Sequence, residues 1–555
     1  MRHDVWRTWL GFDYSSLHPL ESAEILRGIT HGVRVDFTGP RETNRRCTNH
    51  PMTDEHRDKV SAVIAADVVA GKKAGPFAAP PFAHFWCSPI GCVPKRGTDK
   101  VRVIHDLSHG SPASVNDFIE YREHHLGSFD DAMDAVRRLG RGCWLVKLDV
   151  EAAYKQVPVD PADWHLLGFT WLGQYYHERT LPFGLRSSCR KWDLYATALH
   201  HFMQKHLGIH CTVHYVDDFL FVVRDLADAT ARRDAALRMC AQLGVPMSPK
   251  KTEGPVTRLT FLGIEIDTEA MEARLSQERL EELRSSLSVW VTRDTASIQE
   301  FQSLAGVLNF VCRVVRPGRV YLRSIIAQVT TLQRLARKSR SGSGAVARAE
   351  RMRQHTLHPD VRADVAWWYH SLAQWNGVGI LYDLEWTAST KLELHTDACT
   401  TGYGALCGTQ WFQGLWTTDQ LAAARRTDRE SMPFLELLAL VLAAATWGPS
   451  WGGRRILFHC DCQPVVQAAG KLSSAQPDMH HLIRQLHSIA ARYGFDFRVE
   501  HIAGAVNVSA DALSRYAMPA FRAASPSAAQ LPSPVASLPL PLRPSAPPAT
   551  TSRTP

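Results

Sequence analysis

The 555-residue sequence lacks several features that would place it in common classes of protein. Its 12 cysteines include no C-x-x-C pair, so neither a zinc module nor a disulfide framework is indicated, and we interpret them as reduced thiols of an intracellular protein, cytoplasmic or nuclear. The N-terminus has no signal-peptide core, and no uninterrupted apolar run predicts a membrane span. The net charge of +8 permits a polyanionic partner without requiring one.

The composition that remains is that of a globular protein. Hydrophobic residues make up 45% and charged residues 21%, and the length suits about three or four domains. Residues 1–80 carry no recognisable chemistry; we expect one helix there, beginning near Thr53 or Asp54 and ending before the glycines at 71–76. Residues 517–555 are rich in Pro, Ser and Ala, which predicts a disordered tail.

The most informative stretch is 212–223, where Asp217 and Asp218 interrupt an apolar, β-branched run. The run predicts a tight hairpin with the two aspartates at its tip. Adjacent carboxylates beside apolar strands are costly unless a cation lies on them, and hard oxygen ligands suit Mg²⁺. A plain polar turn is the alternative interpretation, because Asp also favours turns.

A third carboxylate strengthens the metal interpretation. Residues 144–150 predict an apolar strand ending at Asp149, and two such strands bring three carboxylates together, as two-metal phosphoryl transfer requires. Residues 88–107 predict a hairpin that carries Lys95 and Arg102, cations suited to a phosphate. A solvated basic turn explains the same residues of that hairpin.

Three motifs in order, LDVEAAY at 148–154, LPFGL at 181–185 and YVDD at 215–218, resemble the palm of retroelement reverse transcriptases. The resemblance implies that Asp149, Asp217 and Asp218 bind two magnesium ions. It also implies that Tyr154 is a steric gate against ribonucleotides, although simple core packing is the alternative. The family's further nucleotide-binding positions fall on Pro182, Phe183 and Gly184 beneath the nucleotide, and on Lys95 and Arg102 at the triphosphate.

Residues after the palm motifs extend the resemblance. SPKKT at 248–252 resembles the motif whose lysine acts near the leaving group, so Lys251, or else Lys250, is a candidate general acid. A solvated lysine pair is the alternative. FLGIEI at 261–266 is similar to the hairpin that grips the primer. Apolar spacing then predicts helices around 275–287 and 298–310, which fits a thumb. Ser108 departs from the family pattern, since many relatives have arginine there.

A second set of acids follows in the last third of the chain. Asp397 and Asp461 end predicted strands, Glu436 lies in a strongly apolar helix, and Asp511 lies in a final helix. Over 390–516 this order resembles ribonuclease H of retroelements. The resemblance implies that these acids bind two magnesium ions and that His501 assists the water or the product. A packed or solvated histidine is the alternative for His501.

The resemblance implies an α+β multidomain protein: a right-hand polymerase with fingers, palm and thumb, then an RNase H-like α/β domain and a disordered tail. We predict boundaries at 1–80, 81–270 (fingers and palm), 271–389 (thumb and connection), 390–516 and 517–555. Motifs at 302–310 and 316–319 are most similar to DIRS-type, tyrosine-recombinase retrotransposons; gypsy-like elements and pararetroviruses share the general plan.

The expected activity is RNA-directed DNA synthesis with cleavage of RNA in RNA–DNA hybrids. The implied partners are an RNA template, a DNA primer, the hybrid, deoxynucleoside triphosphates and a separate recombinase or integrase, with no membrane. The cofactor is Mg²⁺, two per site, and Mn²⁺ also suits oxygen ligands. A domesticated or decayed protein that binds nucleic acid without catalysis is the alternative.

Overall fold

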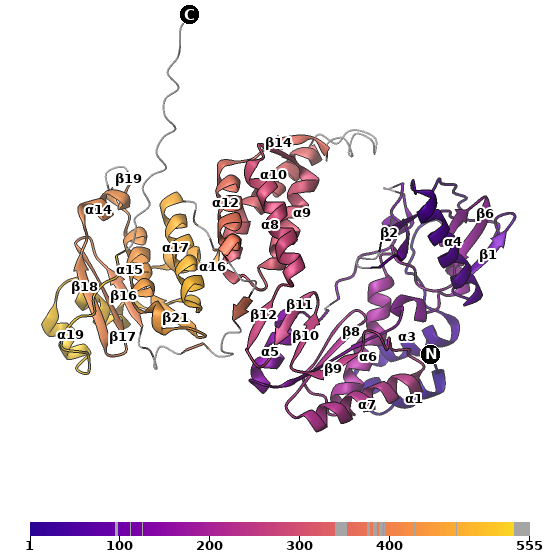
Figure 1. The fold of residues 1–555 in the computed structure, drawn as a ribbon, viewed down its shortest axis with the longest axis horizontal. Coiled ribbons are helices and arrows are strands. Elements are labelled where there is room, and N and C mark those ends of the chain that lie inside the picture. Colours follow the sequence, from indigo (N-terminus) through magenta and orange to yellow (C-terminus); the bar gives the residue numbers. More distant parts are fainter. Residues whose placement is uncertain are drawn as a thin grey trace, which may run out of the picture. The chain divides into compact units, whose positions relative to one another are not determined.

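The computed structural model describes residues 1–94, 98–110, 113–124, 126–338, 352–374, 378–380, 386–387, 392, 394–426, 429–472, 474 and 476–537. The chain divides into two compact units, Met1–Leu262 and Gly263–Pro555 (Figure 1). The division falls at 262/263 rather than at the predicted 270/271. Both units combine helices with sheets, as an α+β multidomain protein does.

The first unit has these elements: α1 (His3–Leu10), α2 (Tyr14–Leu17), α3 (Pro19–His31), α4 (Asp54–Val69), β1 (Lys73–Phe77), β2 (Ile90–Pro94), β3 (Val101–His105), η1 (Val115–Phe118), α5 (Phe129–Leu139), β4 (Trp144–Asp149), η2 (Ala153–Gln156), η3 (Pro161–Leu166), β5 (Gly168–Trp171), β6 (Gln174–Glu178), α6 (Ser188–Lys205), β7 (Thr212–Tyr215), β8 (Asp218–Val223), α7 (Leu226–Leu243), β9 (Glu253–Val256) and β10 (Arg258–Phe261).

The palm sheet has the strand order β7-β8-β4-β9. Strands β7 and β8 form the predicted hairpin, with Tyr215 opposite Asp218. Strand β4 pairs antiparallel with β8, and Leu148 and Phe219 lie opposite each other with no exposed surface. Helices α5, α6 and α7 pack on these strands. The apolar run at 212–223 therefore forms the two strands of a hairpin, because its side chains fill this core.

Residues 1–80 belong to the first compact unit rather than forming a separate region. Helix α4 begins as predicted, with the Thr53 side chain accepting a hydrogen bond from the His56 amide. Helices α1 to α3 were missed by the sequence prediction, and they place Trp6 in the same core as the palm. The Trp6 indole Nε1 donates to the Leu243 carbonyl at 3.0 Å, and its ring meets Tyr195 edge to face.

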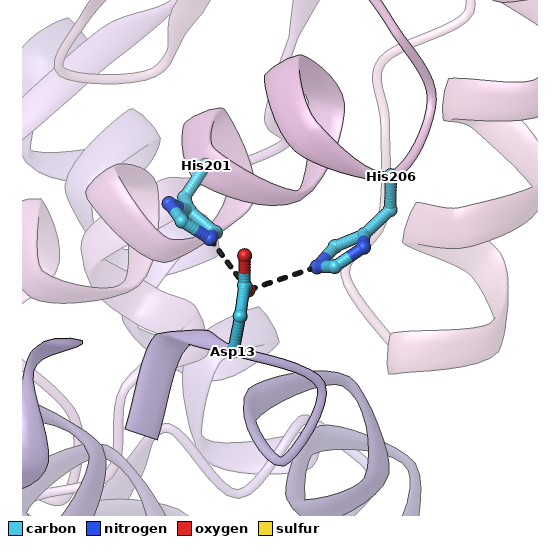
Figure 2. Close-up of side chains that lie close together, drawn as sticks. All are labelled: Asp13, His201 and His206. Atoms are coloured by element: carbon cyan, nitrogen blue, oxygen red, sulfur yellow. Dashed lines mark hydrogen bonds and ion pairs between the residues drawn. The ribbon is translucent and has the colours of Figure 1, made fainter. Parts of the chain in front are cut away.

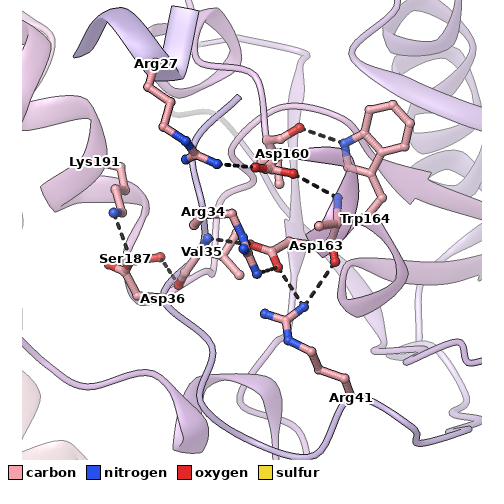
Figure 3. Close-up of polar contacts among 12 residues, drawn as sticks. Arg27, Arg34, Val35, Asp36, Arg41, Asp160, Asp163, Trp164, Ser187 and Lys191 are labelled. Atoms are coloured by element: carbon pink, nitrogen blue, oxygen red, sulfur yellow. Dashed lines mark hydrogen bonds and ion pairs between the residues drawn. The ribbon is translucent and has the colours of Figure 1, made fainter. Parts of the chain in front are cut away.

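Charged contacts hold the chain after α3 to the η3 segment (Figure 3). Asp163 is fully buried and accepts two hydrogen bonds from the Arg34 guanidinium and one from the Val35 amide, each at 2.9 Å. Arg41 adds an ion pair at 2.8 Å. A buried carboxylate with this many donors fixes one geometry, because losing them would leave its charge unpaired.

The second unit has these elements: β11 (Ile264–Asp267), β12 (Glu272–Arg274), α8 (Gln277–Thr292), β13 (Thr295–Ser297), α9 (Ile298–Val311), η4 (Arg316–Leu322), α10 (Arg323–Lys338), β14 (Gln354–Thr356), α12 (Pro359–Gln374), β15 (Val378–Ile380), β16 (His395–Ala398), β17 (Gly402–Cys407), β18 (Gln410–Leu415), α14 (Thr418–Ala424), β19 (Arg425–Arg426), β20 (Arg429–Glu430), α15 (Met432–Trp447), η5 (Gly448–Ser450), β21 (Arg455–Cys460), α16 (Gln463–Gly470), α17 (Pro477–Tyr493), β22 (Asp496–His501), η6 (Gly504–Val506), α18 (Val508–Ser514) and α19 (Met518–Ala524).

The predicted thumb helices are α8 and α9. The predicted ranges 271–389 and 390–516 share this one compact unit. Direct contacts join them: the Tyr321 hydroxyl lies 3.1 Å from the Ser488 Oγ, and the fully buried Asp364 accepts a hydrogen bond from Arg484. The division at 389/390 that the sequence predicts is therefore not a division between compact units.

The last five-stranded sheet has the order β18-β17-β16-β21-β22, with β21 parallel to β16 and β22 and the remaining pairs antiparallel. Helix α15 packs on β16 and β17, and α18 packs on the same two strands. Residues 432–450 are long and apolar enough to cross a membrane by length and composition alone, contrary to the sequence expectation, but 72% of this stretch is buried inside the unit. It is the core helix of this fold.

The predicted disordered tail begins too early. Residues 517–537 are described, and α19 packs Phe521, fully buried, against Trp411. The Ala529 amide donates to the Thr409 carbonyl at 2.7 Å, which fastens the segment to β18 and its turn. Composition alone did not predict this order, because the packing of one aromatic pair stabilises a segment that is otherwise rich in small residues and proline. Residues 538–555 lie outside the described residues.

Replacing Trp6 should show that the N-terminal helices belong to the core of the first unit. Trp6→Ala removes a fully buried ring and should destabilise the first unit by about 3–5 kcal/mol. Leu20→Ala, at a side chain that is 82% exposed on α3, is the matched control and should have little effect. Urea denaturation of the full chain followed by circular dichroism measures both. Equal stability of the two variants would show that Trp6 contributes no core packing.

Candidate active sites

The palm carboxylates are brought together by backbone pairing. Asp149 ends β4 directly opposite Asp218 at the start of β8. The turn between β7 and β8 places Val216 at φ 55°, and two hydrogen bonds hold this turn: Trp192 Nε1 to the Val216 carbonyl at 2.7 Å and the Val150 amide to the Asp217 carbonyl at 2.9 Å. The third predicted carboxylate therefore joins the other two, which a simple polar turn does not explain.

The electrostatics of this cluster suit a cation. Burial, followed by repulsion from Asp217 and Asp149, raises the pKa of Asp218 to about 6. Burial and Asp149 likewise raise the pKa of Asp217. The Lys251 Nζ lies 2.7 Å from an Asp149 oxygen, and the charges of Lys147 and Arg102 also act on Asp218 and Asp217, respectively. Burial lowers the pKa of Lys251, but the hydrogen bond from Lys251 to Asp149 and the nearby negative charges raise it by more, so the net shift is upward. These cations leave the pKa values of Asp217 and Asp218 raised, so a divalent ion fits here.

The predicted nucleotide-binding residues gather around one aromatic ring. The Tyr154 and Phe183 rings lie 5.2 Å apart, and the Arg102 guanidinium lies 4.8 Å from the centre of the Phe183 ring. Burial, above all, raises the pKa of Tyr154, so its hydroxyl stays neutral. Arg102 is exposed on β3, as a cation that meets a phosphate must be. Lys95 lies outside the described residues.

Gly184 is required by the shape of the loop at 181–185. Its φ is +105°, and a Cβ there would lie 2.0 Å from the His105 carbonyl oxygen, so no other residue fits without moving the backbone. The His105 amide donates to the Phe183 carbonyl at 3.1 Å, and the Ser188 hydroxyl donates to the Pro182 carbonyl at 2.8 Å. The loop is therefore held rigidly beneath Tyr154.

Asn116 is a positioning residue that the sequence analysis left without a role. Its side-chain amide donates to the Gly184 carbonyl at 2.8 Å and to the Ser108 hydroxyl at 2.9 Å, and its oxygen accepts from the Arg186 amide at 2.8 Å. Ser108, which stands where many relatives have arginine, thus accepts a hydrogen bond from Asn116. The sequence feature that could have indicated this role is the capping box of Ser114 and Asp117, because it fixes the turn that orients the Asn116 side chain.

The second carboxylate set is positioned by parallel strands. Strand β16 pairs with β21 through His395 and His459, so Asp397 and Asp461, each two residues further on, reach the same edge of the sheet. Glu436 comes from α15, and its carboxylate lies within 4.8 Å of ligand atoms of Asp461 and Cys460. Cys460 contributes a buried thiol, which suits Mg²⁺ poorly.

Helix α18 brings the fourth acid to this edge. The Asn507 side chain donates to the Thr396 carbonyl at 3.0 Å, and the Ser514 hydroxyl donates to the Asp397 carboxylate. Asp511, between them, forms an ion pair with Arg515 at 2.7 Å. His501 ends β22 opposite Cys460 and is exposed. The structure thus brings the four acids to one strand edge, and the role of His501 stays a prediction.

Glu436 has the clearest sign of a missing positive partner. Burial, with repulsion from Asp397 and Asp461, raises its pKa to about 9, and its Oε2 is buried without a hydrogen-bond partner. Burial raises the pKa of Asp397 to about 6, although the Ser514 hydrogen bond opposes this. An orphaned oxygen amid three further acids fits a divalent cation better than any neutral arrangement.

Comparison with known proteins finds a family match in each of the two units. Residues 93–266 match the family model described as reverse transcriptase (RNA-dependent DNA polymerase), and residues 425–517 match the model described as reverse transcriptase-like. Protein P of duck hepatitis B virus (strain China) is 27% identical over 240 residues, covering 42% of this chain and 29% of the viral protein. Polyprotein P3 of Commelina yellow mottle virus is 19% identical over 390 residues, covering 68% and 18%.

Solved structures with a similar chain path include the foamy viral protease-reverse transcriptase. A complex of its dRH form with double-stranded DNA aligns at 14% identity and a TM-score of 0.48, covering 90% of this chain and 81% of that one. A complex with an RNA/DNA hybrid aligns at 14% identity and 0.46, covering 90% and 62%. The chain spans less than a third of the length of the curated relatives it matches.

The fold and the family matches show an RNA-directed DNA polymerase domain followed by an RNase H-like domain. Within that class, the chain is distantly related to the P proteins of hepadnaviruses and to the polyprotein of Commelina yellow mottle virus.

The raised pKa of Glu436 predicts how stability depends on pH without divalent cations. In the folded protein Glu436 keeps its proton up to about pH 9, whereas in the unfolded chain it loses the proton near pH 4.5. The free energy of unfolding therefore falls as the pH rises from 4.5 through about 9. Glu436→Gln removes this ionisation and should stabilise the metal-free protein at pH 8 by about 1–3 kcal/mol, with little change near pH 4.5.

Chemical denaturation with a chelator present, repeated across this pH range, measures the effect. Glu281→Gln, at an exposed position of α8, is the control and should leave the profile unchanged. A Glu436→Gln profile that matches the wild type would show that this carboxylate is already compensated.

Proposed function

We propose that this protein is a retrotransposon reverse transcriptase that copies an RNA template into DNA and cleaves the RNA strand of the resulting hybrid. The observation that carries the proposal is the presence of two separate carboxylate sites, Asp149 with Asp217 and Asp218 in one unit and four further acids in the other. Each is placed by strand ends, as two-metal sites for phosphoryl transfer and phosphodiester hydrolysis are.

Pairs of Mg²⁺ or Mn²⁺ ions would neutralise phosphate charge and lower the pKa of the attacking primer 3′-hydroxyl or water. One pair would be held by Asp149, Asp217 and Asp218, and the other by Asp397, Glu436, Asp461 and Asp511. The protein's own part in such reactions is mainly positioning and charge. In the palm, the carboxylates fix the reacting edge, Arg102 receives the triphosphate, and the rigid loop at Pro182, Phe183 and Gly184 supports the nucleotide and the template base.

Two palm residues would act on the nucleotide directly. Lys251, kept protonated by its contact with Asp149, would give its proton to the departing pyrophosphate. The Tyr154 ring, held against Phe183, would leave no room for a ribose 2′-hydroxyl. In the RNase H-like domain, exposed His501 at the end of β22 would help the water or the cleaved product to move.

The finer origin of the chain is also a proposal. The motifs at 302–310 and 316–319 favour a DIRS-type element, in which a separate recombinase or integrase would complete mobility. The substrates would be an RNA template, a DNA primer and deoxynucleoside triphosphates, and the protein would act inside the cell. A DNA-templated repair polymerase leaves the second carboxylate set without a purpose.

A domesticated or decayed copy that only binds nucleic acid is the second candidate. All seven acids are present in the sequence, whereas decay without selection removes residues at random. Extension of a labelled DNA primer on an RNA template, with both strands followed, separates the candidates: synthesis with template cleavage supports the enzyme, and hybrid binding with neither supports the binding protein.

The two sites should fail independently. Asp218→Asn removes one charge from the palm cluster and should lower DNA synthesis by ~100-fold or more, the order expected when a preorganised charge is lost, while hybrid cleavage persists. Asp397→Asn should do the reverse. Assays of both activities on both variants test this, and parallel loss of the two activities in either variant would contradict the two-site proposal.

The gate assignment makes a separate prediction. Tyr154→Ala should allow ribonucleotide incorporation, because the ring that packs on Phe183 is removed. Tyr154→Phe keeps the ring and serves as the control, with sugar selection unchanged. Single-nucleotide incorporation kinetics with matched deoxy- and ribonucleotides measure the ratio. If the alanine variant selects sugars as the wild type does, Tyr154 is a core residue only.

A further inference from the structure

A group of metal-ligand side chains lies outside both carboxylate sites. Asp13, from the loop between α1 and α2, faces His201 and His206 at the end of α6 (Figure 2). The His201 Nε2 is 2.7 Å and the His206 Nε2 is 3.2 Å from the same Asp13 oxygen, Oδ1. Trp192, which bonds the catalytic hairpin, lies nine residues before His201, so the two places are roughly 13 Å apart along α6.

The three ligand atoms are spaced closely enough to share one ion, since all lie within 4.8 Å of one another. Zinc bonds to His nitrogen and carboxylate oxygen of about 2.0–2.2 Å place tetrahedral ligand atoms roughly 3.3 Å apart. The observed 2.7 and 3.2 Å need to widen only slightly, by side-chain rotation. Both imidazoles already direct Nε2, the usual ligating atom, at the carboxylate (Figure 2).

The surroundings hold these side chains in place. The Asp13 carbonyl accepts hydrogen bonds from the Ser16 amide and hydroxyl and from the Leu17 amide, so the loop has a fixed turn. The His206 ring lies 5.0 Å from the Phe12 ring, and the His201 ring lies 5.1 Å from the Tyr14 ring. Fixed ligands lose little freedom on binding an ion, which raises affinity.

The exposures leave one side open to solvent. The side chains of His201, His206 and Asp13 are 13%, 23% and 39% exposed. Three protein ligands with a solvent-facing side leave room for water as the fourth ligand of a tetrahedral ion. The ligand set, two imidazoles and one carboxylate, suits a borderline ion such as Zn²⁺, whereas Mg²⁺ prefers oxygen throughout.

We propose that Asp13, His201 and His206 bind Zn²⁺, and that this ion fastens the N-terminal helices to α6 of the polymerase unit. Asp13 and His201 are separated by 188 positions in the sequence, so one ion would join two segments of this core that meet only in the folded state. Binding to the folded form alone raises stability by linkage. A hydrogen-bonded ion pair without metal is the competing explanation of the same geometry.

Cobalt and zinc binding to the full-length protein distinguish the two. With Mg²⁺ in millimolar excess to occupy the oxygen sites, one equivalent of Co²⁺ should give visible absorption of a tetrahedral site with nitrogen ligands, and Zn²⁺ should displace it. Dialysed protein should retain about one zinc per chain, and zinc should raise the melting temperature by several degrees, about 2–4 °C per kcal/mol for a domain of this size. Absence of both the Co²⁺ spectrum and retained zinc in the wild type would overturn the proposal.

Variants locate the ion. Asp13→Asn keeps an oxygen that accepts from both imidazoles, and His206→Gln keeps a donor, so both should fold, yet each should weaken zinc affinity by more than about 10-fold and remove the melting shift. His210→Gln, exposed just beyond α6, is the matched control and should bind zinc as the wild type does. Zinc binding unchanged in Asp13→Asn and His206→Gln would place the ion elsewhere and refute the assignment. DNA synthesis by the variants in zinc-free buffer verifies that they are folded.

Discussion

Repulsion between buried carboxylates is the constraint on which the rest of this structure depends. Apolar strands bring Asp149 and Asp218 together at one site, and an apolar helix brings Glu436 to the other. The negative charges at each site therefore reduce the stability of the folded protein unless a cation is bound. Burial first, and then this repulsion, raises the pKa values of Asp218 and Glu436. The surrounding core supplies the free energy that keeps these charges together.

The two sites solve the same electrostatic problem with different architecture. In the palm, an antiparallel hairpin turn places two acids and the neighbouring strand supplies the third. In the RNase H-like domain, parallel strands deliver Asp397 and Asp461 to one edge, and helices supply the other acids. In both sites the acids lie on strands, on helices or in the tight turns and bends directly next to them, which suits chemistry that depends on exact placement of phosphate oxygens.

Residues remote from the reacting edge hold it in place. Asn116 fixes Gly184, Trp192 fixes the hairpin turn, and Asn507 ties α18 to β16. The N-terminal helices add Trp6 to the polymerase core, and the aspartate of the loop after α1 meets two histidines of α6. Side chains of α1 to α3 and of the chain just after them therefore support the palm, whereas α4 packs in a separate apolar cluster with β2, β3 and β5.

The sequence alone determined the fold class and the hairpin at 212–223, and it predicted the thumb helices and the metal-binding role of seven acids, because alternation, apolar runs and acids at strand ends are local patterns. Tertiary structure alone decided that α1 to α3 join the palm core, that 517–537 pack on the RNase H-like sheet, that Asn116 donates to the loop at 181–185, and that Asp13 meets His201 and His206. These depend on contacts between residues far apart in the chain, such as Phe521 with Trp411, which no local pattern specifies.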